Sequence, residues 1–188
     1  MARRYTEIVF TDDVRDAQRE QGVREVARRM EAAPVDDTHL DETTSAFIAE
    51  RDSFYMATVT QDGWPYMQHR GGPRGFVKVL DDRTLAFADF RGNRQLVTTG
   101  NLRGDDRAAL FFMDYPNRRR LKLMARVDVH PVDAQPDLAA RLESPAYRAR
   151  IERVFVLHIE AFDWNCPQHI TPRYTVQELA GAQLSLPD

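Results

Sequence analysis

The sequence contains a single cysteine, Cys166, among 188 residues. One cysteine excludes an intrachain disulfide and a cysteine-rich metal site, and it fits a reducing compartment such as the cytoplasm. No base stands next to Cys166, so a redox-active thiol is the less favoured interpretation of this residue. The five histidines are not arranged at the spacing of metal ligands. The sequence therefore predicts no metal site.

Long apolar runs are absent as well. No run approaches the ~20 residues that a membrane-spanning helix needs, and residues 1–5 lack the apolar stretch of a secretory signal. The formal net charge is -3, and the strongest basic run is Arg118-Arg119-Arg120. That run is interpreted as a solvated hairpin end, because the overall charge argues against a nucleic-acid groove. We expect a cytoplasmic protein with neither a membrane nor a nucleic acid as its partner.

The chain is long enough for one domain with a sizeable core, and we expect residues 1–188 to form a single domain. Apolar residues spaced along one face predict a helix over 11–31, with capping oxygens at Thr11 and a weak point at Gly22. A second short helix is predicted over 41–51. Residues 11–51 are therefore expected to be a helical N-terminal extension.

From residue 54 onward the pattern changes to short β-rich segments. Asp62-Gly63 between two such segments is typical of a hairpin turn. Strands are predicted over 54–60, 65–70, 75–80, 84–88, 107–114, 119–130 and 154–162. Short helices are predicted over 96–102, 137–143 and 146–150, and 164–188 is read as a loop with a final helix beginning near Thr175. Short strands joined by tight turns predict a small antiparallel β-barrel, mainly β with flanking helices.

Residues 89–95 stand out between a predicted strand and a predicted helix. This stretch, Asp89-Phe90-Arg91-Gly92-Asn93-Arg94-Gln95, combines a glycine with two arginines. The start of a helix offers unpaired N–H groups and a partial positive charge, and guanidinium groups are suited to phosphate. The stretch is either an anion-binding corner or a surface turn with solvated arginines.

In the order and spacing of these segments, residues 45–165 resemble the pyridoxamine 5′-phosphate oxidase-like family of FMN-binding split β-barrels. The resemblance rests on the hairpin at 54–65, the strand and corner at 85–94, the strand at 104–112 and the long strand at 119–127. It implies a split antiparallel barrel that binds FMN. It also implies a homodimer with FMN at the subunit interface.

The resemblance also implies which residues contact the cofactor. Arg94 stands where the family usually has a phosphate-binding lysine, Asn93 stands where an arginine is common, and Arg91 can compensate for that lost charge. Gln68, His69 and Arg70 lie on the strand that runs along the flavin in relatives. Arg120 stands where a glutamine near the cofactor often sits. The implied cofactor-binding residues are Gln68, His69, Arg70, Arg91, Asn93, Arg94, Arg120 and Trp164.

Two of these candidates have equally plausible structural roles. His69 can contact the cofactor or be purely structural, and Trp164 can cover the flavin of the partner subunit or belong to a core or interface. No catalytic residue is assigned from the sequence.

The C-terminal segment does not match the one that grips the substrate in the oxidase proper. Residues 164–174 lack that segment's arrangement of arginine and histidine. The resemblance therefore implies an FMN-dependent oxidoreductase acting on an unidentified small molecule, with NAD(P)H or oxygen as a co-substrate. The alternatives are a deazaflavin in place of FMN, or a non-catalytic flavin- or haem-binding carrier or sensor on the same barrel.

Overall fold

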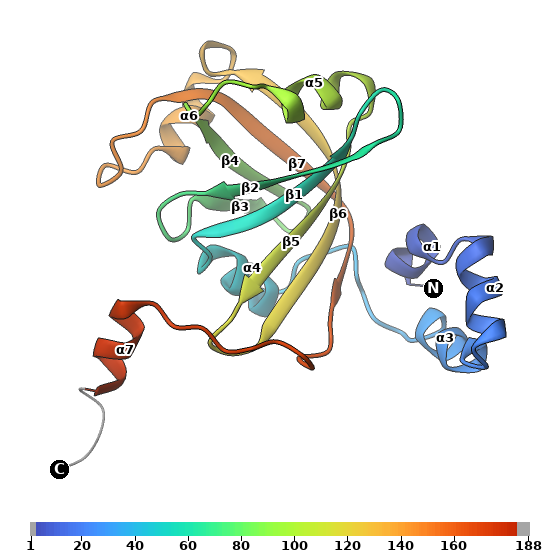
Figure 1. The fold of residues 1–188 in the computed structure, drawn as a ribbon. Coiled ribbons are helices and arrows are strands. Elements are labelled where there is room, and N and C mark those ends of the chain that lie inside the picture. Colours follow the sequence, from blue (N-terminus) through green and yellow to red (C-terminus); the bar gives the residue numbers. More distant parts are fainter. Residues whose placement is uncertain (1–2, 184–188) are drawn as a thin grey trace.

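A seven-stranded antiparallel sheet curls into a barrel in the computed structural model, which describes residues 3–183 (Figure 1). The strand order is β2-β1-β5-β6-β7-β4-β3, so β2 and β3 are the edge strands. The strands are β1 (Ser53–Val59), β2 (Pro65–Gly71), β3 (Val77–Asp81), β4 (Thr84–Phe90), β5 (Arg107–Asp114), β6 (Arg119–Pro131) and β7 (Ile151–Trp164). The predicted fold class, a mainly β split barrel with flanking helices, is confirmed.

The helices lie at the ends and on the outside of the barrel (Figure 1). They are α1 (Arg4–Val9), α2 (Asp12–Glu20), α3 (Arg24–Glu31), α4 (Glu42–Ala49), α5 (Val97–Gly104), α6 (Pro136–Leu142) and α7 (Val176–Gln183), with a 3-10 turn at Val132–Ala134. The helix predicted over 11–31 is divided into α2 and α3 at Gly22, whose φ of +69° suits glycine. The short helix α1 was not predicted.

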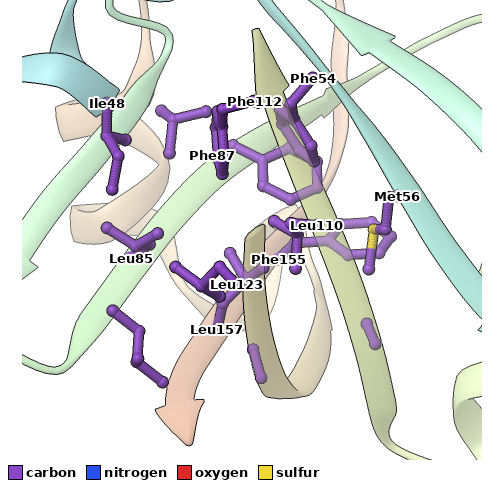
Figure 2. Packing of buried hydrophobic residues seen from close by; sticks show 14 of the residues in the cluster. Ile48, Phe54, Met56, Leu85, Phe87, Leu110, Phe112, Leu123, Phe155 and Leu157 are labelled. Atoms are coloured by element: carbon purple, nitrogen blue, oxygen red, sulfur yellow. The ribbon is translucent and has the colours of Figure 1, made fainter. Parts of the chain in front are cut away.

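Alternation of side chains along the strands builds the core. On β1, β5 and β6 every second residue is buried, as the pattern of Leu121, Leu123, Ala125 and Val127 predicted. Figure 2 shows the aromatic centre of this cluster. The Phe54 ring lies 5.0 Å from Phe112 and 5.3 Å from Phe87, measured between centroids.

The N-terminal helices are joined to one end of the barrel by charged side chains. The Asp37 carboxylate accepts hydrogen bonds from the backbone N–H groups of Arg4 and Tyr5, each at 3.0 Å, and so caps α1. Arg3 donates to Asp163 at 2.6 Å, near the end of β7. At the same end α4 places Phe47 against Trp164, with 4.7 Å between ring centroids. This end of the barrel is therefore closed by packing.

One predicted helix is wrong. Residues 146–150 form no helix in the structure. Pro145 lies in a turn in which the backbone N–H of Tyr147 bonds to the carbonyl of Ser144 at 2.9 Å. The Tyr147 ring then packs against Phe90 at 5.0 Å, and the carbonyl of Arg150 accepts from the N–H of Arg91 at 2.8 Å. Tertiary contacts outweigh local helix propensity here.

The predicted capping box is confirmed at α7. Glu178 accepts from the N–H of Thr175 at 2.7 Å, and the Thr175 hydroxyl accepts from the N–H of Glu178 at 3.2 Å. No helix within residues 3–183 has the length and apolar character required to cross a bilayer.

The aromatic core yields a stability prediction. Phe112 is fully buried, so Phe112→Ala should lower the free energy of unfolding by about 3–5 kcal/mol through lost burial and a residual cavity. Urea denaturation followed by circular dichroism measures this loss. Leu179→Ala on the exposed side of α7 is the control and should change stability by less than about 0.5 kcal/mol. A loss below about 1 kcal/mol for Phe112→Ala would contradict the described packing.

Candidate functional site

The inward face of β2 is polar, unlike the inward faces of its neighbours. Tyr66, Gln68 and Arg70 are half-buried, whereas Met67 and His69 on the other face are exposed. Gln68 accepts hydrogen bonds from the Tyr66 hydroxyl at 3.2 Å and the Thr98 hydroxyl at 3.1 Å. The second of these bonds connects the edge strand β2 to the first turn of α5. The apolar core gives way at this point to a polar cavity.

The chain turns sharply between β4 and α5. Arg94 and Leu96 have φ values of +61° and +58°, the left-handed region that non-glycine residues seldom adopt. Leu96 occupies the position before α5, where no side chain caps the helix. The first N–H groups of α5 are therefore available to a ligand. The corner predicted from residues 89–95 exists and leads directly into a helix N-terminus.

A cavity of about 190 Å³ lies between this corner and the inward face of β2. It is lined by Tyr66, Gln68, Arg70, Asp89, Phe90, Gly92, Asn93, Arg94, Gln95, Leu96, Val97, Thr98, Thr99, Glu152 and Arg153. Three arginines face two carboxylates in this lining.

Asp89 is the best-buried charged group of the cavity, at 6% exposure. It accepts from Arg70 on β2 at 2.6 Å and from Arg153 on β7 at 2.7 Å. Burial lowers the pKa of Arg70 despite the opposing attraction of Asp89. The Nε atom of Arg70 is buried and has no hydrogen-bond partner among the described residues.

Glu152 provides the second negative charge. Its carboxylate lies 3.8 Å from the Nε atoms of both Arg91 and Arg94 and 3.2 Å from the guanidinium of Arg153. The two corner arginines remain half or more exposed. Their contacts to Glu152 are long, so both side chains are held loosely and can turn toward an incoming anion.

The structure brings together five of the eight cofactor-binding candidates. Gln68, Arg70, Asn93 and Arg94 line the cavity, and Arg91 lies beside it on Glu152. Asn93 uses its side-chain oxygen to accept from the N–H of Gln95 at 3.2 Å, which stabilises the corner.

The other three candidates lie elsewhere in the protomer. His69 is exposed on the outer face of β2, where its ring lies 5.6 Å from that of Tyr55. Arg120 alternates with the buried Leu121 and so also faces outward. Trp164 ends β7, the strand whose other end bears Glu152 and Arg153. Contact of these three with a cofactor stays a prediction, which for Trp164 concerns the flavin of a partner subunit.

Three charged members of the cavity lining were not identified as site residues from the sequence. Glu152 and Arg153 begin β7 and reach the cavity only because Arg153 pairs with Asp89 across β4 and β7. Asp89 was noted as part of the corner without a role. No local motif marks these residues, since their importance depends on strand register.

Comparison with known proteins agrees with this architecture. Residues 40–165 match the family model described as pyridoxamine 5′-phosphate oxidase. The chain belongs to this family. The match ends at residue 165, near the start of the 164–174 segment that departs from the oxidase proper. No curated protein matches the sequence.

Solved structures share the fold. A putative pyridoxamine 5′-phosphate oxidase from Lactobacillus delbrueckii is 23% identical, covers 69% of this chain and 97% of its own, and superposes with a TM-score of 0.53. HupZ from Group A Streptococcus is 14% identical, covers 72% of this chain and 99% of its own, and gives a TM-score of 0.51. At these identities the likeness concerns the fold.

Among the histidine, cysteine, aspartate and glutamate side chains of the described residues, no group of three or more is placed to hold a metal ion. The donors of the cavity are guanidinium, amide and hydroxyl groups, which suit a phosphate rather than a cation.

The position of Glu152 generates a prediction. Glu152→Gln removes a negative charge from beside Arg91 and Arg94, so it should tighten binding of a phosphate-bearing ligand about fivefold, or about 1 kcal/mol. Titration calorimetry with FMN measures this change. Glu160→Gln, which removes a carboxylate paired with Arg126 outside the cavity lining, is the control and should leave affinity unaltered. Equal or weaker binding by Glu152→Gln would contradict the assignment.

Proposed function

We propose that the chain binds FMN with its phosphate in this cavity and acts as a flavin-dependent oxidoreductase on a small molecule. The observation that carries the proposal is the charge of the site. Four guanidinium groups, including Arg91, meet two carboxylates around an uncapped helix start. The excess of two positive charges matches a phosphate monoester, which carries about -1.5 to -2 at neutral pH. Membership of the family supports FMN as the bearer of that phosphate.

The size of the cavity limits what it can hold. About 190 Å³ is smaller than the ~300–1,000 Å³ usual for a whole small-molecule site. It suits the phosphate and the adjoining part of the ribityl chain. The ring system then lies beyond the cavity, against a surface that one protomer does not complete.

The outer face of the barrel offers such a surface. A groove of about 460 Å³ is lined mainly by apolar and aromatic side chains of β1, β2, β5 and β6. They include Tyr55, Met67, Phe111 and Met124, and Met67 is 67% exposed. A large exposed apolar patch is typical of a protein interface. We infer that this face joins two copies in a homodimer, with FMN at the seam.

The bound flavin would supply the redox chemistry, and the protein would bind and orient it. Arg70, Arg94 and the first turn of α5 would hold the phosphate. The amide oxygen of Gln68 accepts from the Tyr66 and Thr98 hydroxyls, which leaves its NH2 group to donate to the cofactor. NAD(P)H or oxygen is the proposed co-substrate.

One observation favours a non-catalytic alternative. Both carboxylates of the cavity lining, Asp89 and Glu152, are engaged by arginines, so neither is free to act as a general base. A flavin carrier or sensor would need no such base. Purified yellow protein that bleaches with NAD(P)H and recovers in air would support the oxidoreductase. Bound flavin without turnover across donors would support the carrier.

Removal of one corner arginine tests the phosphate assignment. Arg94→Ala should weaken FMN binding by about 1.5–3 kcal/mol, the range for a hydrogen bond to a charged group. Calorimetry or fluorescence titration of FMN measures the effect. Arg103→Ala at the far end of α5 is the control, because Arg103 is exposed and lies outside the cavity lining. Unchanged FMN affinity in Arg94→Ala would remove Arg94 from the site.

The proposed dimer is tested on the outer face. Met67→Glu places a charge in the apolar groove, so it should shift the protein from dimer to monomer and weaken FMN binding at least tenfold. Light scattering during size-exclusion chromatography reports the mass. Val35→Glu, also at an exposed apolar residue but distant in sequence from β2, is the control. A wild-type protein that is monomeric at all concentrations would refute the dimer.

A further inference from the structure

The strongest unassigned feature of the molecule is the triad of Arg70, Asp89 and Arg153. Its three members come from β2, β4 and β7, which are far apart in the chain and are brought together at the cavity. The side chains of Arg70, Asp89 and Arg153 are 13%, 7% and 20% exposed. Desolvating three charges is unfavourable, so a contribution to stability alone does not explain this arrangement.

The geometry fixes both arginines on one carboxylate. Arg70 bonds to Oδ1 of Asp89 at 2.6 Å, whereas the Nε of Arg153 bonds to Oδ2 at 2.7 Å. Asp89 also pairs with Arg153 in the register of β4 and β7, so the backbone sets their separation. The Arg70 guanidinium lies 5.2 Å from the centre of the Phe155 ring, which limits its freedom on the core side. Both guanidiniums are therefore pre-organised.

The triad carries one more positive than negative charge. All three residues line the same cavity as the start of α5, and the Nε of Arg70 is buried without a partner among the described residues. A second cavity of about 140 Å³ shares Gln68, Arg70, Asp89 and Phe90 with the first, so Arg70 and Asp89 belong to the wall between the two cavities. A buried positive group facing a cavity is suited to an anion.

We propose that Arg153 is a direct ligand of the phosphate group in this cavity and that Asp89 is the positioning residue that holds Arg153 and Arg70 for it. This inference rests on the proposed function in taking FMN as the bearer of the phosphate. It assigns opposite roles to the two carboxylates of the cavity. Glu152 competes with the phosphate, through long contacts to Arg91 and Arg94 and a 3.2 Å bond to Arg153, whereas Asp89 creates the binding geometry through bonds of 2.6 and 2.7 Å.

Because the two carboxylates have opposite roles, neutralising each one should change the affinity for FMN in opposite directions. Asp89→Asn keeps the shape of the side chain but can accept from the guanidiniums only through its single oxygen. The buried guanidinium groups of Arg70 and Arg153 then lose their shared counter-ion and repel each other. The pre-organised phosphate site is therefore lost. Asp89→Asn should weaken FMN binding at least tenfold, although it removes a negative charge. Glu152→Gln also removes a negative charge, but it should tighten FMN binding.

The experiment compares FMN with riboflavin, which lacks the phosphate, by titration calorimetry on the full-length protein. Arg153→Gln and Asp89→Asn should each weaken FMN binding about tenfold or more and leave riboflavin binding unchanged. The double variant should be no more than about threefold weaker than the worse single variant, because Asp89 acts through the arginines. The controls are Arg126→Gln, an arginine paired outside the cavity, and Asp114→Asn, a carboxylate buried elsewhere. Both should leave the two affinities unchanged.

Several results would overturn the inference. Equal loss of FMN and riboflavin affinity in Asp89→Asn would show a structural role only, and tighter FMN binding would make Asp89 a second competing charge. Unchanged FMN affinity in Arg153→Gln would remove Arg153 as a ligand.

Failure of the proposed function is distinguished with inorganic phosphate as the probe. If the wild-type protein binds no FMN, side-chain ¹⁵Nε resonances of arginine are followed during a phosphate titration. Shifts of the Arg153 and Arg70 resonances that disappear in Asp89→Asn would support the anion site for another phosphate-bearing ligand. Absence of these shifts in the wild type would refute the inference together with the function.

Discussion

The carboxylate of Asp89 connects parts of the barrel that the sheet itself leaves separate. β2 and β3 are the two edges of the sheet, and β4 lies next to β3. Through Arg70 on β2, at 2.6 Å, the Asp89 side chain ties one edge to the strand beside the other. Through Arg153 it also fixes the beginning of β7. The cavity lies where β2 is held to β4 by charge, whereas β4 and β7 are also joined as neighbouring strands of the sheet.

Such an interaction is an inefficient way to stabilise a fold. An apolar group in place of a buried ion pair is often as stable or more so, and the neighbouring core of Phe54, Phe87 and Phe112 shows that this chain can fill the barrel with aromatic rings. Next to α5 the lining of the barrel changes from phenylalanine to arginine and aspartate. The charges are therefore best understood as a binding arrangement that the apolar core supports.

Local patterns predicted most of the fold. The alternation of Leu121, Leu123 and Ala125, the Asp62-Gly63 turn and the Thr175 capping box each depend on near neighbours in the chain, and all are observed. The helix expected at 146–150 failed because the packing of Tyr147 on Phe90 decides that segment, and this contact joins residues distant in sequence.

Without the family resemblance, which implied Gln68 and Arg70, the site was predictable only where its residues are contiguous in the chain. The corner at 89–95 could be recognised because its glycine, its arginines and the following helix are contiguous. Arg153 and Glu152 could not, because their place at the cavity depends on the register between β4 and β7. Placing Trp164 relative to any cofactor depends on an arrangement of two chains, which a single sequence does not encode in a local pattern.

The length of β7 has a practical consequence. This strand of 14 residues begins at the cavity with Glu152 and Arg153 and ends where Arg3 bonds to Asp163. At ~3.3 Å per residue, the two ends of a strand of this length lie further apart than a side chain can reach. An affinity handle or fluorophore fused ahead of α1 would thus sit at the end of the barrel away from the corner arginines. Labelling at that terminus leaves the arginine-lined pocket of the same protomer unobstructed.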